Sequence, residues 1–265
     1  MQLIVDIGNS NIVLAIYRND SWYSIFRYET RENQPQLFFE RGIRDILLEW
    51  GVKAKDISLI GISSVVPDLN ERLINASQHV VGLIPKLITP EILMALDMHV
   101  PKPYEIGSDL VANAYAASRK YNTNAIIVDF GTALTFTVVD LMEGIKGVTI
   151  APGLKTAIQS LAGNTAQLPL VSLEIPTSVI GKSTAHAMQA GVMVGYKGLV
   201  KEIIHSMIRE LAPMEYKVIS TGGLSQFVEY IKEEIDITDK HLTLDGIRMI
   251  CNYHTTIWSV GYYLI

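Results

Sequence analysis

Two aspartates in this chain each end a run of apolar, largely β-branched residues, and each is followed two positions later by a glycine. Asp6 and Gly8 form the first pair, and Asp129 and Gly131 form the second. An apolar run of this kind favours a buried strand, and glycine permits the tight turn that ends it. A second apolar run follows each glycine. Each copy therefore predicts two strands joined by a turn, with a carboxylate beside the turn.

The residue types at these turns suit a phosphate group and its cations. Small hydroxyl and amide side chains leave room for a polyanion and can donate to its oxygens, and the carboxylates can hold cations that neutralise it. The side chains concerned are Asn9, Ser10 and Asn11 in the first copy, and Thr132 and Thr135 in the second. The alternative is a pair of β-hairpins whose Asp and Asn residues only form turns. Turn formation alone does not require both aspartates at matching positions.

Two copies of one unit in a chain of 265 residues indicate a duplicated domain, with a site between the halves. We expect an α/β fold with domains at residues 1–121 and 122–265. Strands are predicted at residues 3–5, 12–17, 22–28, 59–66, 83–88, 125–129, 134–140, 147–150 and 218–220. Helices are predicted at residues 36–50, 69–81, 110–120, 153–161, 184–211 and 224–235, and from residue 245 towards the C-terminus.

The composition narrows the class of protein. Apolar residues make up 49% of the chain and charged residues 18%, which is typical of a compact globular protein. The net charge of −5 argues against binding to nucleic acid or to an anionic membrane. Cys251 is the only cysteine, and no apolar run is long enough to span a membrane. We therefore expect a cytoplasmic protein with small-molecule ligands.

A third candidate for chemistry is Asp109, in the segment Glu105-Ile106-Gly107-Ser108-Asp109 that precedes a predicted helix. An aspartate in the first turn of a helix can cap it and interact with its dipole, and periodicity alone favours that role. The functional alternative is a general base that accepts a proton from an attacking hydroxyl group.

Two glycine patterns add weaker signals. Thr221-Gly222-Gly223 lies between a strand and a helix, where small residues let a flat ligand or a phosphate lie against the backbone. Gly191, Gly195 and Gly198 form a strip of small residues along the longest predicted helix. Each glycine costs a helix interior about 1 kcal/mol, so the strip needs a packing reason. Packing within the chain and a homodimer interface are both open.

Taken together, the motifs resemble the type III pantothenate kinases, which belong to the actin-like (ribonuclease H-like) superfamily of ATPases and kinases. The matching segments occur in the family's order and cover nearly the whole chain. They are residues 6–11, 105–109, 129–133, 150–153, 165–169, 181–184 and 221–223. The resemblance implies two actin-like domains with ATP in the cleft between them, and transfer of a phosphoryl group from ATP to pantothenate, forming 4'-phosphopantothenate. It also implies a homodimer.

The resemblance assigns roles to individual residues. Asp109 is the implied proton acceptor, Asp6 the residue near Mg²⁺, and Asp129 the ligand of a monovalent cation, K⁺ or NH₄⁺. The implied ATP-binding residues are Asp6, Ile7, Gly8, Asn9, Ser10, Asn11, Ile12, Val13, Gly131, Thr132, Gly222 and Gly223. The implied pantothenate-binding residues are Val100, Gly107, Ser108, Asp109, Leu110 and Thr184.

Two of these positions depart from the family pattern. The family usually has arginine where this chain has Leu110, and tyrosine where it has Val100. Losing one charge-assisted hydrogen bond costs roughly 1.5–3 kcal/mol, or about ten- to a hundredfold in affinity. Candidates to replace the missing cation are Lys102, Lys155 and Lys182. Two other functions follow from the departures: a kinase for another small alcohol, and a nucleotide-binding or regulatory protein without catalytic activity.

Overall fold

A computed structural model of the chain describes the backbone of residues 1–261, and the side chains of these residues except 225, 226 and 254–261. The chain forms two units. Met1–Ala116 and His241–Ile265 make the first, and Ala117–Lys240 makes the second. The predicted boundaries, 1–121 and 122–265, differ from this grouping chiefly in the C-terminal helix, which belongs with the first unit.

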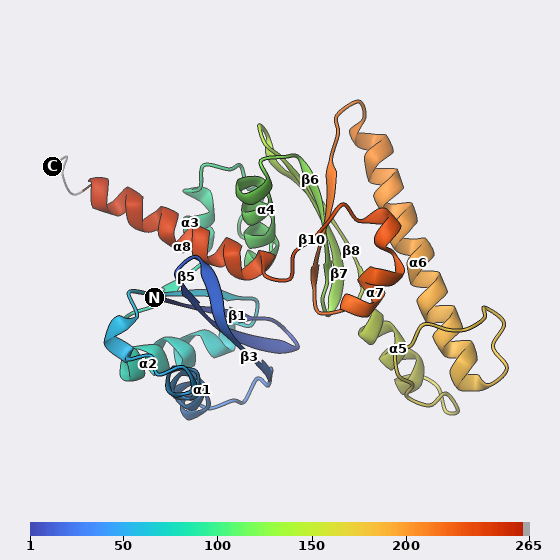
Figure 1. The fold of residues 1–265 in the computed structure, drawn as a ribbon, viewed down its shortest axis with the longest axis horizontal. Helices are drawn as coiled ribbons and strands as arrows, with labels where there is room; N and C mark the ends of the chain where they lie inside the picture. The colour runs from blue at the N-terminus through green and yellow to red at the C-terminus, as the bar shows by residue number, and fades with distance from the viewer. Residues whose placement is uncertain (262–265) are drawn as a thin grey trace. The chain divides into compact units, whose positions relative to one another are not determined.

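The first unit is built on a five-stranded mixed sheet with the order β3-β2-β1-β4-β5 (Figure 1). Its strands are β1 (Gln2–Ile7), β2 (Asn11–Arg18), β3 (Ser21–Glu29), β4 (Leu59–Ser64) and β5 (Lys86–Leu87). The first three strands form an antiparallel meander, while β4 and β5 run parallel to β1. The central strand β1 therefore has β2 on one side and β4 on the other, and Asp6 lies near its end.

The second unit repeats this topology. Its strands are β6 (Ala125–Phe130), β7 (Ala133–Asp140), β8 (Gly144–Pro152), β9 (Lys217–Gly222) and β10 (Ile237–Thr238), in the order β8-β7-β6-β9-β10. The central strand β6 pairs antiparallel with β7 and parallel with β9, as β1 does with β2 and β4. The duplicated α/β fold predicted from the two Asp-x-Gly units is therefore confirmed.

Helices cover the first sheet on both faces. Alternate residues of β1, namely Leu3, Val5 and Ile7, are fully buried in the core that also contains α1 (Gln36–Glu49) and α2 (Asn70–Val81). On the other face lies α8 (Leu242–Gly261), where Gln2 Nε2 donates to Asn252 Oδ1 at 2.8 Å. Asp6 shares the alternation of Gln2, so its side chain lies on the α8 face of the sheet.

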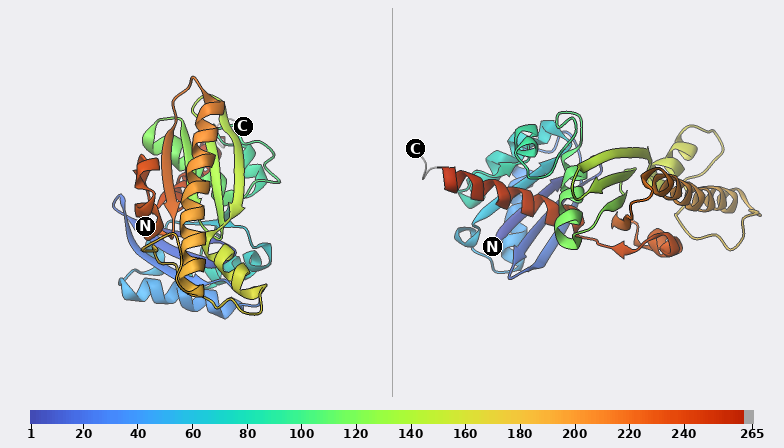
Figure 2. Two further views of the ribbon diagram at one scale, coloured as in Figure 1. Left: turned by 90° about the vertical axis from the view of Figure 1, so that its right-hand side faces the viewer. Right: turned by 90° about the horizontal axis from the view of Figure 1, so that it is seen from above.

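In the second unit the main covering element is α6 (Thr184–Leu211), which lies in front of the sheet in the left view of Figure 2. Its buried residues Met188, Val192 and Val200 pack in one core with Val128 of β6 and Phe136 of β7. Two shorter helices, α5 (Leu154–Gly163) and α7 (Ser225–Tyr230), join this core through Leu154, Ile158 and Phe227.

Two further helices are α3 (Pro90–Met94), which was not predicted, and α4 (Ser108–Tyr121). The helix predicted at 224–235 is wrong in its second half. It ends at Tyr230, a short 3₁₀ turn follows at Lys232–Glu234, and the chain then enters β10. The apolar residues at 231 and 235 have helical spacing, but Ile237 pairs with Ile219 and extends the sheet instead.

Candidate functional site

The turn between β1 and β2 is held by hydrogen bonds to its backbone. The Gly8 N–H donates to Asn11 O at 2.9 Å, which closes the turn. Thr30, directly after β3, donates from its N–H to Ser10 O at 3.0 Å and from its hydroxyl to Gly8 O at 2.7 Å. The side chains of Asn9, Ser10 and Asn11 are exposed. The structure therefore presents the predicted polar side chains on a fixed turn.

The turn between β6 and β7 is held in an analogous way, again by the segment after the third strand. Thr132 O accepts from Gly153 N–H at 3.0 Å and from the Thr156 hydroxyl at 2.7 Å. Gly131 and Thr132 are exposed. Both copies of the unit thus place an exposed turn beside an aspartate.

The two aspartates differ in their neighbours across the sheet. Asp6 is in register with Val13 and Ser63, whereas Asp129 is in register with Thr135 and Thr221. Side chains in register lie on the same face of a sheet. The Thr135 and Thr221 hydroxyls are buried and have no hydrogen-bond partner within the described part of the chain. A buried hydroxyl without a partner is costly, so this group of oxygens fits a cation held at Asp129.

The strand β9 brings a third predicted residue to Asp129. Gly222 has φ = 97°, and a Cβ atom there would lie 2.7 Å from Asp129 Oδ1. The next N–H, that of Gly223, donates to Phe130 O at 3.3 Å. Only glycine fits this conformation and this approach. The structure therefore brings together Asp129, Gly222 and the neighbouring turn.

In the first unit, Asp109 lies in the opening turn of α4. Its Oδ1 accepts from Leu110 N–H at 2.8 Å, so the helix contact considered from the sequence is present. The carboxylate also bends over Gly107, where a Cβ atom would clash with Asp109 Oδ1. The residue is half-buried, but protein atoms crowd its carboxyl group. This desolvation raises the pKa of Asp109 above its ordinary value, against the opposing effect of the backbone hydrogen bonds.

The remaining predicted acceptor residues have varied environments. Val100 and Leu110 are buried, with 8% and 9% of their surface exposed. Ser108 is buried as well, and Thr184 is exposed at the first position of α6. Of the lysines suggested as replacement cations, Lys102 forms an exposed ion pair with Glu105 at 3.1 Å. Lys155 and Lys182 are exposed.

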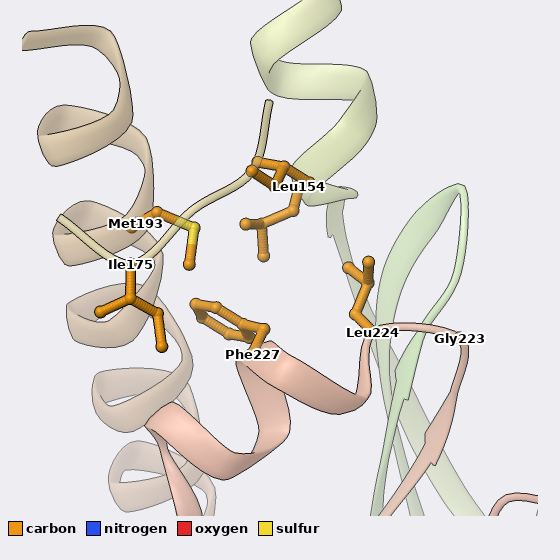
Figure 3. Close-up of a pocket in the computed structure, with 7 residues that line it drawn as sticks. Leu154, Ile175, Met193, Gly223, Leu224 and Phe227 are labelled. Atoms are coloured by element: carbon orange, nitrogen blue, oxygen red, sulfur yellow. The ribbon is translucent and has the colours of Figure 1, made fainter. Parts of the chain in front are cut away.

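One feature of the second unit was missed from the sequence: an apolar cavity of about 190 Å³ beside Gly223 (Figure 3). It is partly open and is lined by residues from α5, α6 and α7, from the segment between α5 and α6, and from the turn after β9. The lining residues are Leu154, Leu173, Ile175, Met193, Gly223, Leu224 and Phe227. The only sequence signal was the Gly222-Gly223 pair, because the lining residues come from distant segments.

Clusters typical of a multidentate metal centre are absent from the described residues, among which no group of three His, Cys, Asp or Glu side chains could hold an ion. Asp6 and Asp129 each offer one carboxylate. This suits Mg²⁺ in phosphate-handling sites, where the metal binds one or two carboxylates and takes further ligands from the substrate and water.

Among the residues that the structure describes, no helix is long and apolar enough to cross a membrane.

Solved structures with similar folds include the following two examples. The activator of 2-hydroxyisocaproyl-CoA dehydratase from Clostridium difficile, solved with bound ADPNP, matches with a TM-score of 0.57 and 11% identity, covering 100% of this chain and 97% of that chain. A putative Baf family transcriptional activator from Campylobacter jejuni matches with a TM-score of 0.53 and 22% identity, covering 96% and 99%. At these identities the likeness concerns the fold.

Sequence relatives are closer. Type III pantothenate kinases from an Exiguobacterium species and from Citrifermentans bemidjiense are 36% and 38% identical to this chain, over 250 and 252 residues. Each match covers 94% of this chain and 98% of the relative. The family model for type III pantothenate kinase matches residues 2–206. The chain therefore belongs to the type III pantothenate kinase family.

Proposed function

We propose that this protein is a pantothenate kinase. It transfers the γ-phosphoryl group of ATP to the primary alcohol of pantothenate and forms 4'-phosphopantothenate, the first step of coenzyme A biosynthesis. Membership of the family supports the reaction, and the structural observation that carries it is the Asp109 carboxylate in the first turn of α4, which accepts from the Leu110 N–H at 2.8 Å. A carboxyl group with a raised pKa is a stronger base once ionised, which suits a proton acceptor at neutral pH.

The two turns are proposed to bind the phosphates of ATP. Residues 6–13 provide backbone N–H groups and small polar side chains in the first unit, and Gly131 and Thr132 do so in the second. Mg²⁺ binds near Asp6, where it neutralises phosphate charge. The apolar cavity beside Gly223 suits the flat purine ring, with Gly222 and Gly223 against the base or ribose.

We propose that K⁺ or NH₄⁺ binds at Asp129, with the Thr135 and Thr221 hydroxyls as further oxygen ligands. The support is that both hydroxyls are buried beside the carboxylate without another partner among the described residues. When bound, the cation supplies positive charge near the phosphates. Phosphoryl transfer depends chiefly on such charge neutralisation and on in-line positioning of the reacting groups.

The acceptor is proposed to bind at Gly107–Leu110 together with Val100 and Thr184. In this arrangement the Asp109 carboxylate accepts the proton of the pantothenate hydroxyl as its oxygen bonds to the γ-phosphorus. The bond between the γ-phosphorus and the bridging oxygen breaks, and ADP leaves with that oxygen. The Leu110 N–H holds Asp109 Oδ1, which leaves Oδ2 as the oxygen for the proton.

The glycine strip of α6 supports a homodimer. A Cβ atom added at Gly191, Gly195 or Gly198 would meet no atom within 4 Å, and all three residues are exposed. No described part of the chain packs on the strip, so packing within the chain does not account for it. Light scattering of the wild type and of a Gly195→Glu variant tests this proposal, since a charged side chain on the strip should yield monomers.

We further propose a cytoplasmic location without nucleic-acid binding, in keeping with the net charge of −5.

The burial of Val100 and Leu110 favours one second candidate, a kinase for another, less polar small alcohol. A coupled assay of ADP release over pantothenate and a set of small alcohols separates the candidates. Release with pantothenate alone supports the first, and release only with another alcohol supports the second. ATP binding without transfer to any acceptor would leave the non-catalytic alternative.

A further inference from the structure

A hydrogen bond between two buried serine hydroxyls connects the sheet that carries Asp6 to the helix that carries Asp109. The Ser63 and Ser108 Oγ atoms lie 2.9 Å apart. Ser63 is fully buried near the end of β4, and Ser108 is buried as the first residue of α4. This bond joins residues 45 positions apart in the chain. It fixes the start of the helix that carries Asp109 to the central sheet.

The end of β4 is also fixed to the phosphate-binding turn. Ser63 is the register partner of Asp6 in the parallel pair of β4 and β1. Two residues further on, the Val65 N–H donates to Ile7 O at 2.9 Å, directly before Gly8. The side chain of Val65 also lies beside Gly107, since its Cγ1 is 3.7 Å from where a Cβ atom would be. The end of β4 therefore contacts both β1 and the segment that leads into α4.

We infer that Ser63 is a positioning residue for the phosphoryl transfer, acting through its hydrogen bond to Ser108. The bond sets the place of the Asp109 carboxylate relative to the turn at Asp6–Gly8. This inference rests on the proposed function, because it concerns the acceptor base of that reaction. The side chain of Ser63 acts on the acceptor segment through Ser108, because its hydroxyl oxygen lies 2.9 Å from Ser108 Oγ.

The hydrogen bond between Ser63 and Ser108 affects the rate of phosphoryl transfer because it orients the Asp109 carboxylate. A displacement of about 1 Å at a reacting group can cost about a hundredfold in rate, even when the altered residue lies away from the chemistry. Asp109 is the next residue after Ser108, so a shift of the first turn of α4 moves the carboxylate directly. The same shift changes how protein atoms enclose the carboxyl group, and hence its pKa.

The test is a double-mutant cycle of Ser63→Ala, Ser108→Ala and the double variant, with Ser58→Ala as control. Ser58 precedes the opposite end of β4, and its hydroxyl donates to Met1 O at 3.1 Å. We expect each pair variant to lower kcat by about ten- to a hundredfold with the KM for ATP unchanged. The double variant should lose no more than the single variants, and Ser108→Thr, which keeps the hydroxyl, should recover most of the rate.

A second readout is independent of turnover. NMR titration of the Asp109 carboxyl carbon should give a lower midpoint pH in Ser63→Ala than in the wild type, because water gains access to the carboxyl group. The acid limb of the kcat profile should move in the same direction. A wild type without pantothenate-dependent ADP release overturns the proposed function, while the titration still tests the pair. Unchanged kcat and unchanged Asp109 titration in Ser63→Ala, with Ser58→Ala as the reference, would overturn the inference.

Discussion

The two Asp-x-Gly units have the same strand topology but different chemistry around their carboxylates. In the first unit, Asp6 lies between the methyl groups of Val13 and the Ser63 hydroxyl, which is already bonded to Ser108. In the second, Asp129 lies between Thr135 and Thr221, whose buried hydroxyls have no partner in the described chain. In the first unit, the hydroxyl beside the aspartate binds the start of α4. In the second unit, the two hydroxyls beside the aspartate can bind a cation.

The turns differ as well. Three residues separate β1 from β2, whereas two separate β6 from β7. The longer turn closes on itself through the Gly8 to Asn11 hydrogen bond, and it exposes a run of small polar side chains. Duplication therefore preserved the strand topology, while the side chains around each carboxylate diverged. We propose that both turns bind phosphates, that Mg²⁺ and the proton acceptor belong to the first unit, and that the monovalent cation and the purine belong to the second.

The largest expected effect comes from removing the charge of Asp109 in the first unit. Asp109→Asn should lower kcat by roughly 10² to 10⁴-fold, the usual contribution of a general base. The KM for ATP should stay near the wild-type value, because the nucleotide residues are unchanged. Steady-state ADP release measures both quantities. Asp68→Asn, at an exposed position of the same unit, is the matched control and should keep full activity.

The same substitution makes a prediction about stability. Burial raises the pKa of Asp109, so the contribution of this group is fully present below its ordinary pKa and is lost as pH rises through the raised value. Asp109→Asn removes this pH-dependent loss of stability, because asparagine does not titrate. The variant should have a higher Tm than the wild type at pH 7, and the difference should vanish near pH 4 or below. A lower Tm at pH 7 would contradict this account of the site.

A smaller effect is expected from restoring a cation beside Asp109. Leu110→Arg should lower the KM for pantothenate by about ten- to a hundredfold. This is the contribution of one charge-assisted hydrogen bond to the carboxylate of pantothenate. Leu110→Met provides a control of similar length without charge. If the KM were equal in the two variants, the acceptor would be recognised without a cation at this position, and the departure from the family pattern would have no consequence for affinity.

The smallest effect concerns the second unit and is measured without turnover. A cation at a hundred times its Kd stabilises a protein by about 2.7 kcal/mol, which corresponds to roughly 5–10 °C in Tm for a chain of this size. The wild type should therefore melt at a higher temperature in KCl than in choline chloride of equal ionic strength. Asp129→Asn should abolish this difference, and Thr221→Val should at least halve it.

The control for that experiment is Thr137→Val. Thr137 is buried on β7, two residues beyond Thr135, and lies opposite Ile127 instead of Asp129. This variant should change overall stability while keeping the full K⁺ effect. A Tm that is equal in the two salts, or a Thr221→Val variant that keeps the wild-type response, would remove the proposed difference between the two copies.

Much of this arrangement could be predicted from local patterns. The buried strands and the turns follow from apolar runs that end in Asp-x-Gly, and the two meanders follow from their repetition. Asp6 and Asp129 could be selected by their type and position, whereas periodicity alone favours a helix-capping role for Asp109 and only the family resemblance implies the proton acceptor. Local signals were sufficient wherever the responsible residues are close together in the sequence.

The rest depends on contacts between distant segments. The bond between Ser63 and Ser108 spans 45 residues, and the apolar cavity draws its walls from α5, α6, α7 and the segment before α6. The sequence did not predict that the helix at 224–235 ends early. The apolar residues at 231 and 235 have helical spacing, but the pairing of Ile237 with β9 extends the sheet instead. The place of the last helix follows from contacts such as the Trp22 Nε1 to Asp245 hydrogen bond of 3.0 Å. No sequence pattern near these residues reports such contacts.

Pantothenate kinase activity is tested most directly by the transfer of labelled phosphate from γ-labelled ATP to pantothenate by the wild-type protein. The reaction contains Mg²⁺ and K⁺, and ³¹P NMR identifies the product. We expect label in 4'-phosphopantothenate, a strong dependence on K⁺, and almost no product with Asp109→Asn. A folded, ATP-binding wild type that leaves all label in ATP or inorganic phosphate would show that the protein is not a pantothenate kinase.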